Sequence, residues 1–182
     1  MSQATTPKPK DAVLDMVAIN GATHASTALS KWFGRDVRIE TDGFAKIPLT
    51  RLSNLMGDPE DVVVAIHTRI EGAMSGHVLL AFPERVAFAL IDLLIGQPQG
   101  TTDAVDEMGR SAIQETGNIV SSAFINSLST AMAIRAAPGV PEFQHDMSGP
   151  IMEPLVIEQL AVSDSALMIP AVFEIDALAL DW

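Results

Sequence analysis

Residues 106–129 read DEMGRSAIQETGNIVSSAFINSLS and are the stretch that decides the fold of this chain. Its apolar positions can turn to one side of a helix while its polar positions turn to the other, which predicts a long amphipathic helix. We expect this helix to run from a cap at Asp103 to about Leu128, because Asp106 and Glu107 then lie near its positive end. Such a helix needs a second apolar layer against which to pack.

A similar helix precedes it in the chain. From Ala12 to Phe33 the apolar residues recur mostly three or four positions apart, and Gly34 is suited to end the helix. Thr27–Ser30 reads TALS near the end of this helix, and Asn126–Ser129, 99 positions later, reads NSLS near the end of the other. The correspondence predicts two halves of similar plan.

Shorter segments between and after these helices predict the remaining elements. Strands are expected at Val37–Glu40, Val62–Ile70, His77–Phe82, Met132–Ala137 and Ala166–Ile175, with the second and third forming a hairpin. Helices are expected at Leu49–Met56, Pro83–Gly96 and Met147–Leu160, the last of them helical or irregular, and loops at Gln97–Thr102 and Pro138–Asp146.

These elements predict an α+β fold, a mostly antiparallel sheet with the two long helices packed on one face and an internal pseudo-two-fold repeat. Residues 1–10 are polar, contain two prolines and are expected to be a flexible N-terminus. Residues 11–182 are expected to form a single domain of two pseudo-repeats, about 11–98 and 103–182, joined by the polar segment 97–102.

Composition narrows the class of protein. The 182 residues include 23 acidic and 11 basic side chains, a formal charge of −12, and 48% are hydrophobic. This balance is typical of a folded globular protein, and the acidic excess argues against binding to nucleic acid or to anionic membrane surfaces. Neither a membrane-spanning run nor the apolar core of a secretory signal is found, which predicts a soluble cytoplasmic protein. With no cysteine, the chain has no disulfide, thiolate zinc site or cysteine nucleophile.

The familiar site motifs are missing from the sequence. It contains no nucleotide-binding glycine loop, no G-x-S-x-G nucleophile elbow and no paired-histidine metal motif, so we expect no cofactor or metal of its own. The histidines are scattered and are interpreted as surface or structural residues: His24, His67, His77 and His145.

One set of polar residues in the second long helix has the spacing of a site. Ser111, Glu115 and Asn118 are four and then three positions apart, so all three side chains project from one face. A carboxylate and a carboxamide one turn apart can pair with a partner's cation and orient a water. Gly117 between them is expected to let a partner surface approach. The alternative interpretation is an ordinary solvated helix face, which shows the same spacing.

Residues 106–129 resemble the signature helix of the CheC family of chemotaxis phosphatases. The resemblance is carried by the S-x-x-x-E-x-x-N core at Ser111–Asn118 and by the Gly-Asn-Ile and Asn-Ser-Leu-Ser around and after it. Glu71-Gly72 to Phe82-Pro83 is similar to the family's G-x-x-x-G-x-x-x-L-x-F-P hairpin, and Asp146-Met147 follows a proline-containing loop as in the family. The resemblance covers about residues 11–176.

The resemblance implies a CheC-like fold and the removal of the phosphoryl group from a phosphorylated CheY-like response regulator. It assigns Asn118 to orient the attacking water and Glu115 to anchor the partner, with Ser111 belonging to the motif and contributing to docking. An acyl phosphate is already reactive, so aligning one water is most of the catalytic task. Magnesium is expected on the regulator.

The first helix departs from the family pattern. CheC proteins carry the motif twice and CheX proteins once, whereas here Ala12, Met16 and Ile19 occupy the places of Ser, Glu and Asn in the first half. These apolar residues predict that the first site is lost and that its surface either joins the core or binds a partner.

Two alternatives to a phosphatase remain open. The first is a non-catalytic CheC-like adaptor that binds a response regulator, the deamidase CheD or a flagellar switch component. The second is a homodimer supported by the repeat, with no phosphoryl chemistry.

Overall fold

The computed structural model describes residues 9–52, 57–176 and 178–180. The helices are α1 (Pro9–Phe33), α2 (Leu49–Leu52), α3 (Glu84–Ile95), α4 (Glu107–Met132) and α5 (Ser148–Leu160). The strands are β1 (Val37–Glu40), β2 (Ala45–Pro48), β3 (Val62–Gly72), β4 (Gly76–Pro83), β5 (Ala136–Pro138), β6 (Glu142–Met147), β7 (Ser165–Met168), β8 (Val172–Ile175) and β9 (Leu178–Leu180). Of the expected flexible terminus 1–10, residues 1–8 lie outside the described residues, whereas Pro9 and Lys10 already belong to α1. The end of the helix expected at Leu49–Met56 also lies outside the described residues.

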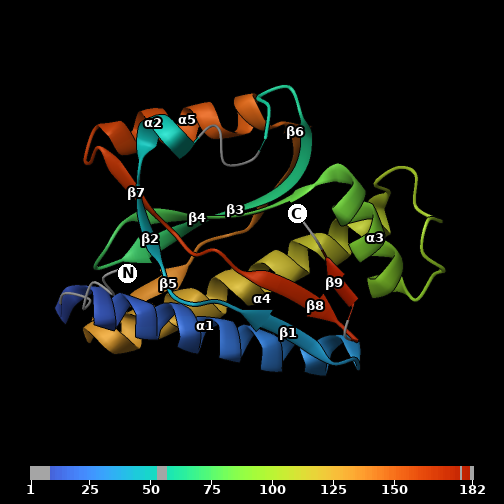
Figure 1. Ribbon diagram of the computed structural model, residues 1–182, viewed down its shortest axis with the longest axis horizontal. Coiled ribbons are helices and arrows are strands. Elements are labelled where there is room, and N and C mark those ends of the chain that lie inside the picture. Colours follow the sequence, from blue (N-terminus) through green and yellow to red (C-terminus); the bar gives the residue numbers. More distant parts are fainter. Residues whose placement is uncertain (1–8, 53–56, 177, 181–182) are drawn as a thin grey trace, which may run out of the picture.

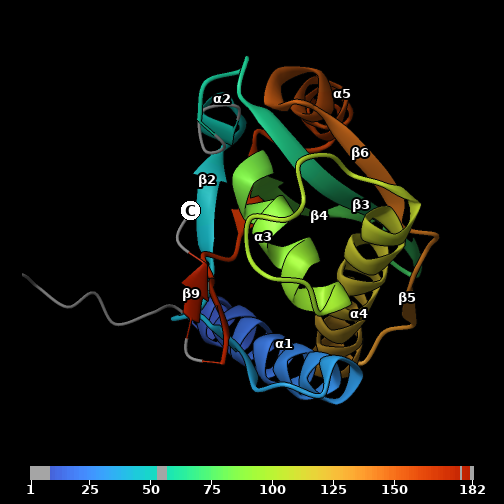
Figure 2. The same ribbon diagram turned by 90° about the vertical axis from the view of Figure 1, so that its right-hand side faces the viewer.

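The two long helices lie side by side and antiparallel (Figures 1 and 2). Ser127 Oγ on α4 donates a hydrogen bond of 3.1 Å to the Val17 carbonyl on α1. One turn away, Gly21 packs against the Phe124 ring so closely that a Cβ would lie 2.4 Å from a ring carbon. The absence of a side chain at Gly21 therefore sets the close approach of the two helices.

All strand pairs in the described part of the chain are antiparallel, and they form three sheets. The central strand β3 pairs with β4 along one edge and with β5 and β6 along the other, while β1–β8–β9 and β2–β7 form two smaller sheets. The predicted α+β class and the β3–β4 hairpin are confirmed. The hairpin lies between α5 on one side and the α1–α4 pair on the other (Figure 1).

Alternation along β3 divides the packing between these two sides. Val64 and Ile66 belong to the main core with residues of α1, α3 and α4. Val63 and Ala65 point the other way and pack with Ile151 of α5. The hairpin thus contributes to two separate apolar clusters.

Four expected boundaries are wrong, each for a tertiary or local reason. The expected strand 166–175 is broken into β7 and β8 around Pro170, which has no N–H to donate to a ladder. The expected loop 138–146 contains β6, because its residues pair with β3 from Val62 to His67. Met132 belongs to α4 and the strand after it begins only at Ala136.

The fourth correction concerns the start of α4. The N-cap is Asp106 and not Asp103, since the Asp106 carboxylate accepts a 2.7 Å hydrogen bond from the Gly109 N–H. Asp103 is exposed in the preceding segment.

The polar segment between α3 and α4 is held by one buried carboxylate. Asp92 of α3 accepts hydrogen bonds from the N–H groups of Gly100, Thr101 and Thr102 at 2.7, 3.0 and 2.9 Å, and from the Thr102 hydroxyl at 2.5 Å. Its side chain is fully buried. The segment that the sequence predicts as a polar linker is therefore fixed to α3 just before α4 begins.

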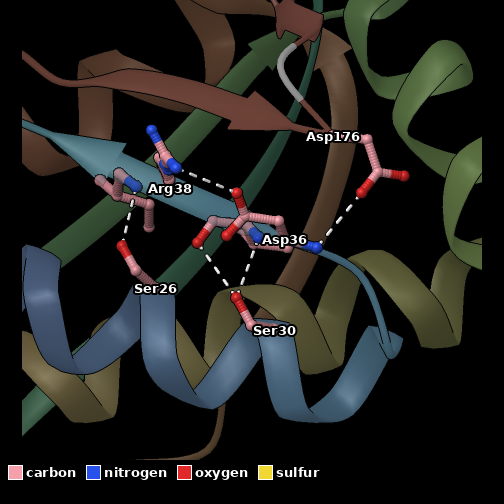
Figure 3. Close-up of polar contacts among 7 residues, drawn as sticks. Ser26, Ser30, Asp36, Arg38 and Asp176 are labelled. Atoms are coloured by element: carbon pink, nitrogen blue, oxygen red, sulfur yellow. Dashed lines mark hydrogen bonds and ion pairs between the residues drawn. The ribbon is translucent and has the colours of Figure 1, made fainter.

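The edge of β1 is covered by serines of α1, as Figure 3 shows. Ser30 Oγ accepts from the Val37 N–H at 2.9 Å and donates to the Val37 carbonyl at 3.1 Å. Ser26 Oγ accepts from the Ile39 N–H at 2.8 Å. A groove of about 710 Å³ runs between α1 and β1 beside these contacts. Because its serine hydroxyls are committed to the backbone of β1, we interpret the groove as a structural feature.

Candidate functional site

The candidate site lies along one face of α4. Ser111 is exposed, and Glu115 and Asn118 are half-buried. The Asn118 Nδ2 donates to Glu115 Oε2 at 3.4 Å, so the two side chains lie together one turn apart. This bond uses the amide N–H of Asn118, and none of the described contacts engages its carbonyl oxygen. The arrangement provides an anionic group for a partner's cation and a carbonyl that can orient a water.

The helix holds this edge outward because its other side is packed. Ile113 and Thr116 are fully buried, and the Thr116 hydroxyl donates to the Ala112 carbonyl at 2.9 Å. Gly117 faces the core as well: a Cβ there would lie 2.4 Å from Ile66 Cγ2. The expectation that Gly117 lets a partner approach is therefore wrong, since it lets β3 approach α4.

A substitution at Gly117 tests this close packing. Gly117→Ala is expected to destabilise the fold by about 1–3 kcal/mol, because the new Cβ meets the branch point of the Ile66 side chain and not its flexible end. Helix propensity alone predicts the opposite sign, a gain of about 1 kcal/mol. Denaturant unfolding measures the free energy of unfolding of Gly117→Ala. The control is Thr130→Ala, at an exposed position of α4. A stabilised Gly117→Ala would contradict the packing argument.

Two contacts with distant residues hold one side of α4 beside the candidate site, and neither contact was expected from the sequence. Gln114 Nε2 donates to the Pro141 carbonyl at 2.7 Å. One turn earlier, the Arg110 guanidinium lies 5.2 Å from the centre of the Phe143 ring. Since 27 or more positions separate the partners, no local pattern in the sequence could have indicated these contacts.

The corresponding face of α1 is apolar and open. The exposed fractions are 60% for Met16, 46% for Ile19 and 42% for Val13, and Ala12 is exposed too. Of the two outcomes expected for this surface, joining the core is therefore excluded, and α1 presents an exposed apolar stripe.

Within residues 9–52, 57–176 and 178–180 no three His, Asp or Glu side chains are arranged to hold a metal ion. No helix of the described part of the chain is long and apolar enough to cross a membrane.

The fold and the motif-bearing helix define a class. The chain belongs to the CheC/CheX/FliY/FliM-like family. It is 26% identical over 159 residues to the CheY-P phosphatase CheC of Bacillus subtilis, covering 86% of this chain and 76% of that protein. It is 30% identical over 125 residues to the flagellar motor switch phosphatase FliY of the same organism, covering 68% of this chain and 32% of FliY. No family model matches the sequence.

Solved structures share the fold. The structure of FliY from Thermotoga maritima matches with a TM-score of 0.74 at 18% identity, covering 96% of this chain and 87% of that one. The FliM middle domain from H. pylori matches with a TM-score of 0.61 at 13% identity, covering 96% and 87%. At these identities the likeness concerns the fold alone.

Proposed function

We propose that this protein dephosphorylates a phosphorylated CheY-like response regulator. The observation that carries the proposal is the pairing of Glu115 and Asn118 on α4, where both side chains stay partly exposed. The relation to CheC and FliY, both named as phosphatases, supports the same chemistry. A reaction on such a regulator would take place in the cytoplasm.

The division of labour follows from the side chains. Asn118 orients the attacking water through its carbonyl oxygen, and Glu115 anchors the partner through a cation, for which a regulator lysine is suited. Ser111, exposed one turn before Glu115, contributes to docking. The phosphoryl group leaves the regulator's aspartate for the water oxygen, so the carboxylate is regenerated and inorganic phosphate is released. Magnesium belongs to the partner in this scheme, and the chain supplies position and charge.

We further infer that the chain is built from two pseudo-repeats within one domain, and the helix ends support this. Gly34 after α1 and Ala133 after α4, 99 positions apart, both have left-handed backbone, with φ of 64° and 52°. Ser30 and Ser129, also 99 positions apart, both hydrogen-bond a carbonyl in the segment that follows their helix.

Strand register supports the same inference. Val37 pairs with Ile175, and Ala136 pairs with Gly72. Ala136 lies 99 positions after Val37, and Gly72 lies 103 positions before Ile175. The same two offsets relate the pair Pro48 and Ser165 to the pair Met147 and Val62. Equal offsets at both ends support a repeat in which β7 and β8 together take the place of β3 in the other half.

The rival proposal is a non-catalytic adaptor, favoured by the exposed apolar stripe of Val13, Met16 and Ile19. An apolar face in the place of a second polar site is suited to hold a partner and not to perform hydrolysis. CheD, a response regulator or a flagellar switch component is the expected partner in that case, and a second copy of the chain is the third alternative.

The test is the decay of the acyl phosphate on phosphorylated CheY-like receivers. Decay is followed without addition, with the wild type, and with the double variant Glu115→Ala/Asn118→Ala. Acceleration by the wild type that is lost in the double variant supports the phosphatase. Binding of a receiver with unchanged decay favours the adaptor.

A further inference from the structure

An arginine at the start of α4 lies beside the candidate site and carries a charge that the proposed reaction does not use. Arg110 is exposed and directly precedes Ser111. Among the described residues, no carboxylate pairs with its guanidinium and no hydrogen bond occupies its side-chain N–H groups. Its donors are therefore available to a group from outside the chain.

The Arg110 side chain is nevertheless held in place. Its guanidinium lies 5.2 Å from the centre of the Phe143 ring on β6, within the range of a cation–π contact. Phe143 is partly buried against the main core and stands opposite Ile66 in the ladder of β6 and β3. A guanidinium on the face of a ring keeps its in-plane N–H groups available, so Arg110 can bind an anion with little further loss of side-chain freedom.

The distance along α4 separates Arg110 from the reacting group. Glu115 follows it by five positions, about 7.5 Å along the helix axis, and Asn118 by eight, about 12 Å. Side chains of a helix lean toward its N-terminus, which takes Arg110 further from Asn118. The anion that Arg110 can bind is therefore a different group from the one that Asn118 serves.

The spacing between the two charges is fixed because α4 is anchored to neighbouring strands and loops along this stretch. After the contact of Arg110 with β6, Gln114 donates to the Pro141 carbonyl at 2.7 Å, and Gly117 packs on Ile66 of β3. Glu115 lies between these last two contacts. A cation and an anion held at a fixed separation match a partner in one orientation and repel it in the reverse one.

We propose that Arg110 binds a carboxylate on the surface of the receiver and thereby sets the orientation in which the receiver docks on α4. This role rests on the proposed function, because the receiver is the partner that it requires. Glu115 takes a cation of the receiver and Arg110 takes an anion, and the two contacts together bring the phosphoryl group to Asn118. Arg110 is thus a specificity-determining residue, since a receiver with a basic group at the corresponding place is repelled.

The first test is the affinity of a receiver for this protein, measured with the receiver unphosphorylated and again with beryllofluoride as a stable stand-in for the phosphoryl group. Arg110→Gln is expected to weaken binding of both forms by the same factor, about 3- to 10-fold, because the carboxylate is present in both. The factor should shrink as the salt concentration rises. A loss confined to the beryllofluoride form would place Arg110 at the phosphoryl group and overturn the carboxylate contact.

The matched control is Arg135→Gln, which removes the same charge from an exposed arginine just beyond the other end of α4. It should leave the affinity unchanged. Arg110→Lys keeps the charge without the planar fork and should retain part of the affinity, whereas Arg110→Glu should weaken binding about tenfold or more. An equal loss in Arg135→Gln would mean that only net charge matters. A lower unfolding midpoint of Arg110→Gln with unchanged affinity would mean that Arg110 has a structural role alone.

The role of Arg110 and the proposed function can fail separately. If the wild type accelerates receiver decay and Arg110→Gln binds as tightly as the wild type, only the role of Arg110 is wrong. If Arg110→Gln weakens binding of a receiver whose decay the wild type does not accelerate, the phosphatase is wrong and Arg110 remains a docking residue of the adaptor. If no receiver binds to the wild type, both are wrong.

Discussion

Replacing Asn118 by alanine is expected to remove nearly all acceleration of receiver dephosphorylation, lowering it about 100-fold or more. A correctly oriented water accounts for most of the catalytic task when the acyl phosphate is already reactive, and loss of one positioning group at such a site costs about 10²–10³ in rate. The acceleration falls because the side chain that holds the water is gone. The measurement is the single-turnover decay of a phosphorylated receiver at saturating concentrations of this protein.

The matched control is Asn126→Ala, an exposed asparagine two turns further along α4. It is expected to leave both the rate and the stability unchanged. Asn118→Ala should likewise change the free energy of unfolding by less than about 0.5 kcal/mol, since Asn118 is only half-buried and makes one 3.4 Å hydrogen bond. A folded Asn118→Ala that retains the wild-type rate would exclude this residue from the reaction.

Glu115→Gln separates anchoring from water positioning. Removing the charge weakens the pair with a partner's cation and should raise the concentration of this protein needed for half-maximal decay more than it lowers the maximal rate. A variant in which only the maximal rate falls would move Glu115 from docking to the chemical step.

Asp92→Ala is expected to lower the free energy of unfolding by about 2–4 kcal/mol, more than Gly117→Ala. The buried carboxylate accepts hydrogen bonds from three N–H groups and the Thr102 hydroxyl, and a single hydrogen bond to a charged group contributes about 1.5–3 kcal/mol without being additive. Exposed Asp103→Ala, in the same segment, is the control and should change stability by less than about 0.5 kcal/mol. Denaturant unfolding monitored by circular dichroism measures both.

The pH dependence of unfolding provides an independent readout of Asp92. Burial raises the pKa of its carboxyl, but the hydrogen bonds from Thr102, Thr101 and Gly100 together bring it below the ordinary value of 3.8. A depressed pKa in the folded state stabilises the fold above the pKa of the unfolded chain and loses that effect as the pH falls through the folded value. Wild type should therefore lose stability below about pH 4 more steeply than Asp92→Ala. Parallel curves would show that Asp92 is not charged in the folded protein.

The elements that the sequence predicted well are those with local signals. The helix ending at Phe33 and Gly34 and the hairpin of β3 and β4 follow from periodicity and from glycine and proline positions, and the structure confirms them. β6 was missed because the segment Glu142–Met147 shows no regular apolar alternation. It is a strand because β3 offers its free edge, which is a tertiary fact.

For the candidate site, the sequence predicted the residues but not their surroundings. The spacing of Ser111, Glu115 and Asn118 places them on one face of any helix that contains them. The role of Gly117 was wrong because its neighbour Ile66 lies on another element. Gln114, beside Glu115, was overlooked because its partner Pro141 is distant in the chain.

The sequence alone determined that two long helices form and that a carboxylate and a carboxamide share one face of the second. These properties depend on residues within a few turns of each other, and the helical period is enough to relate them. Only the tertiary structure decided that Ser111 is exposed while Gly117 is packed, that Asp92 holds the segment before α4, and that Gln114 meets Pro141. Those contacts depend on which elements become neighbours, and that is settled by the burial of apolar faces across the whole chain.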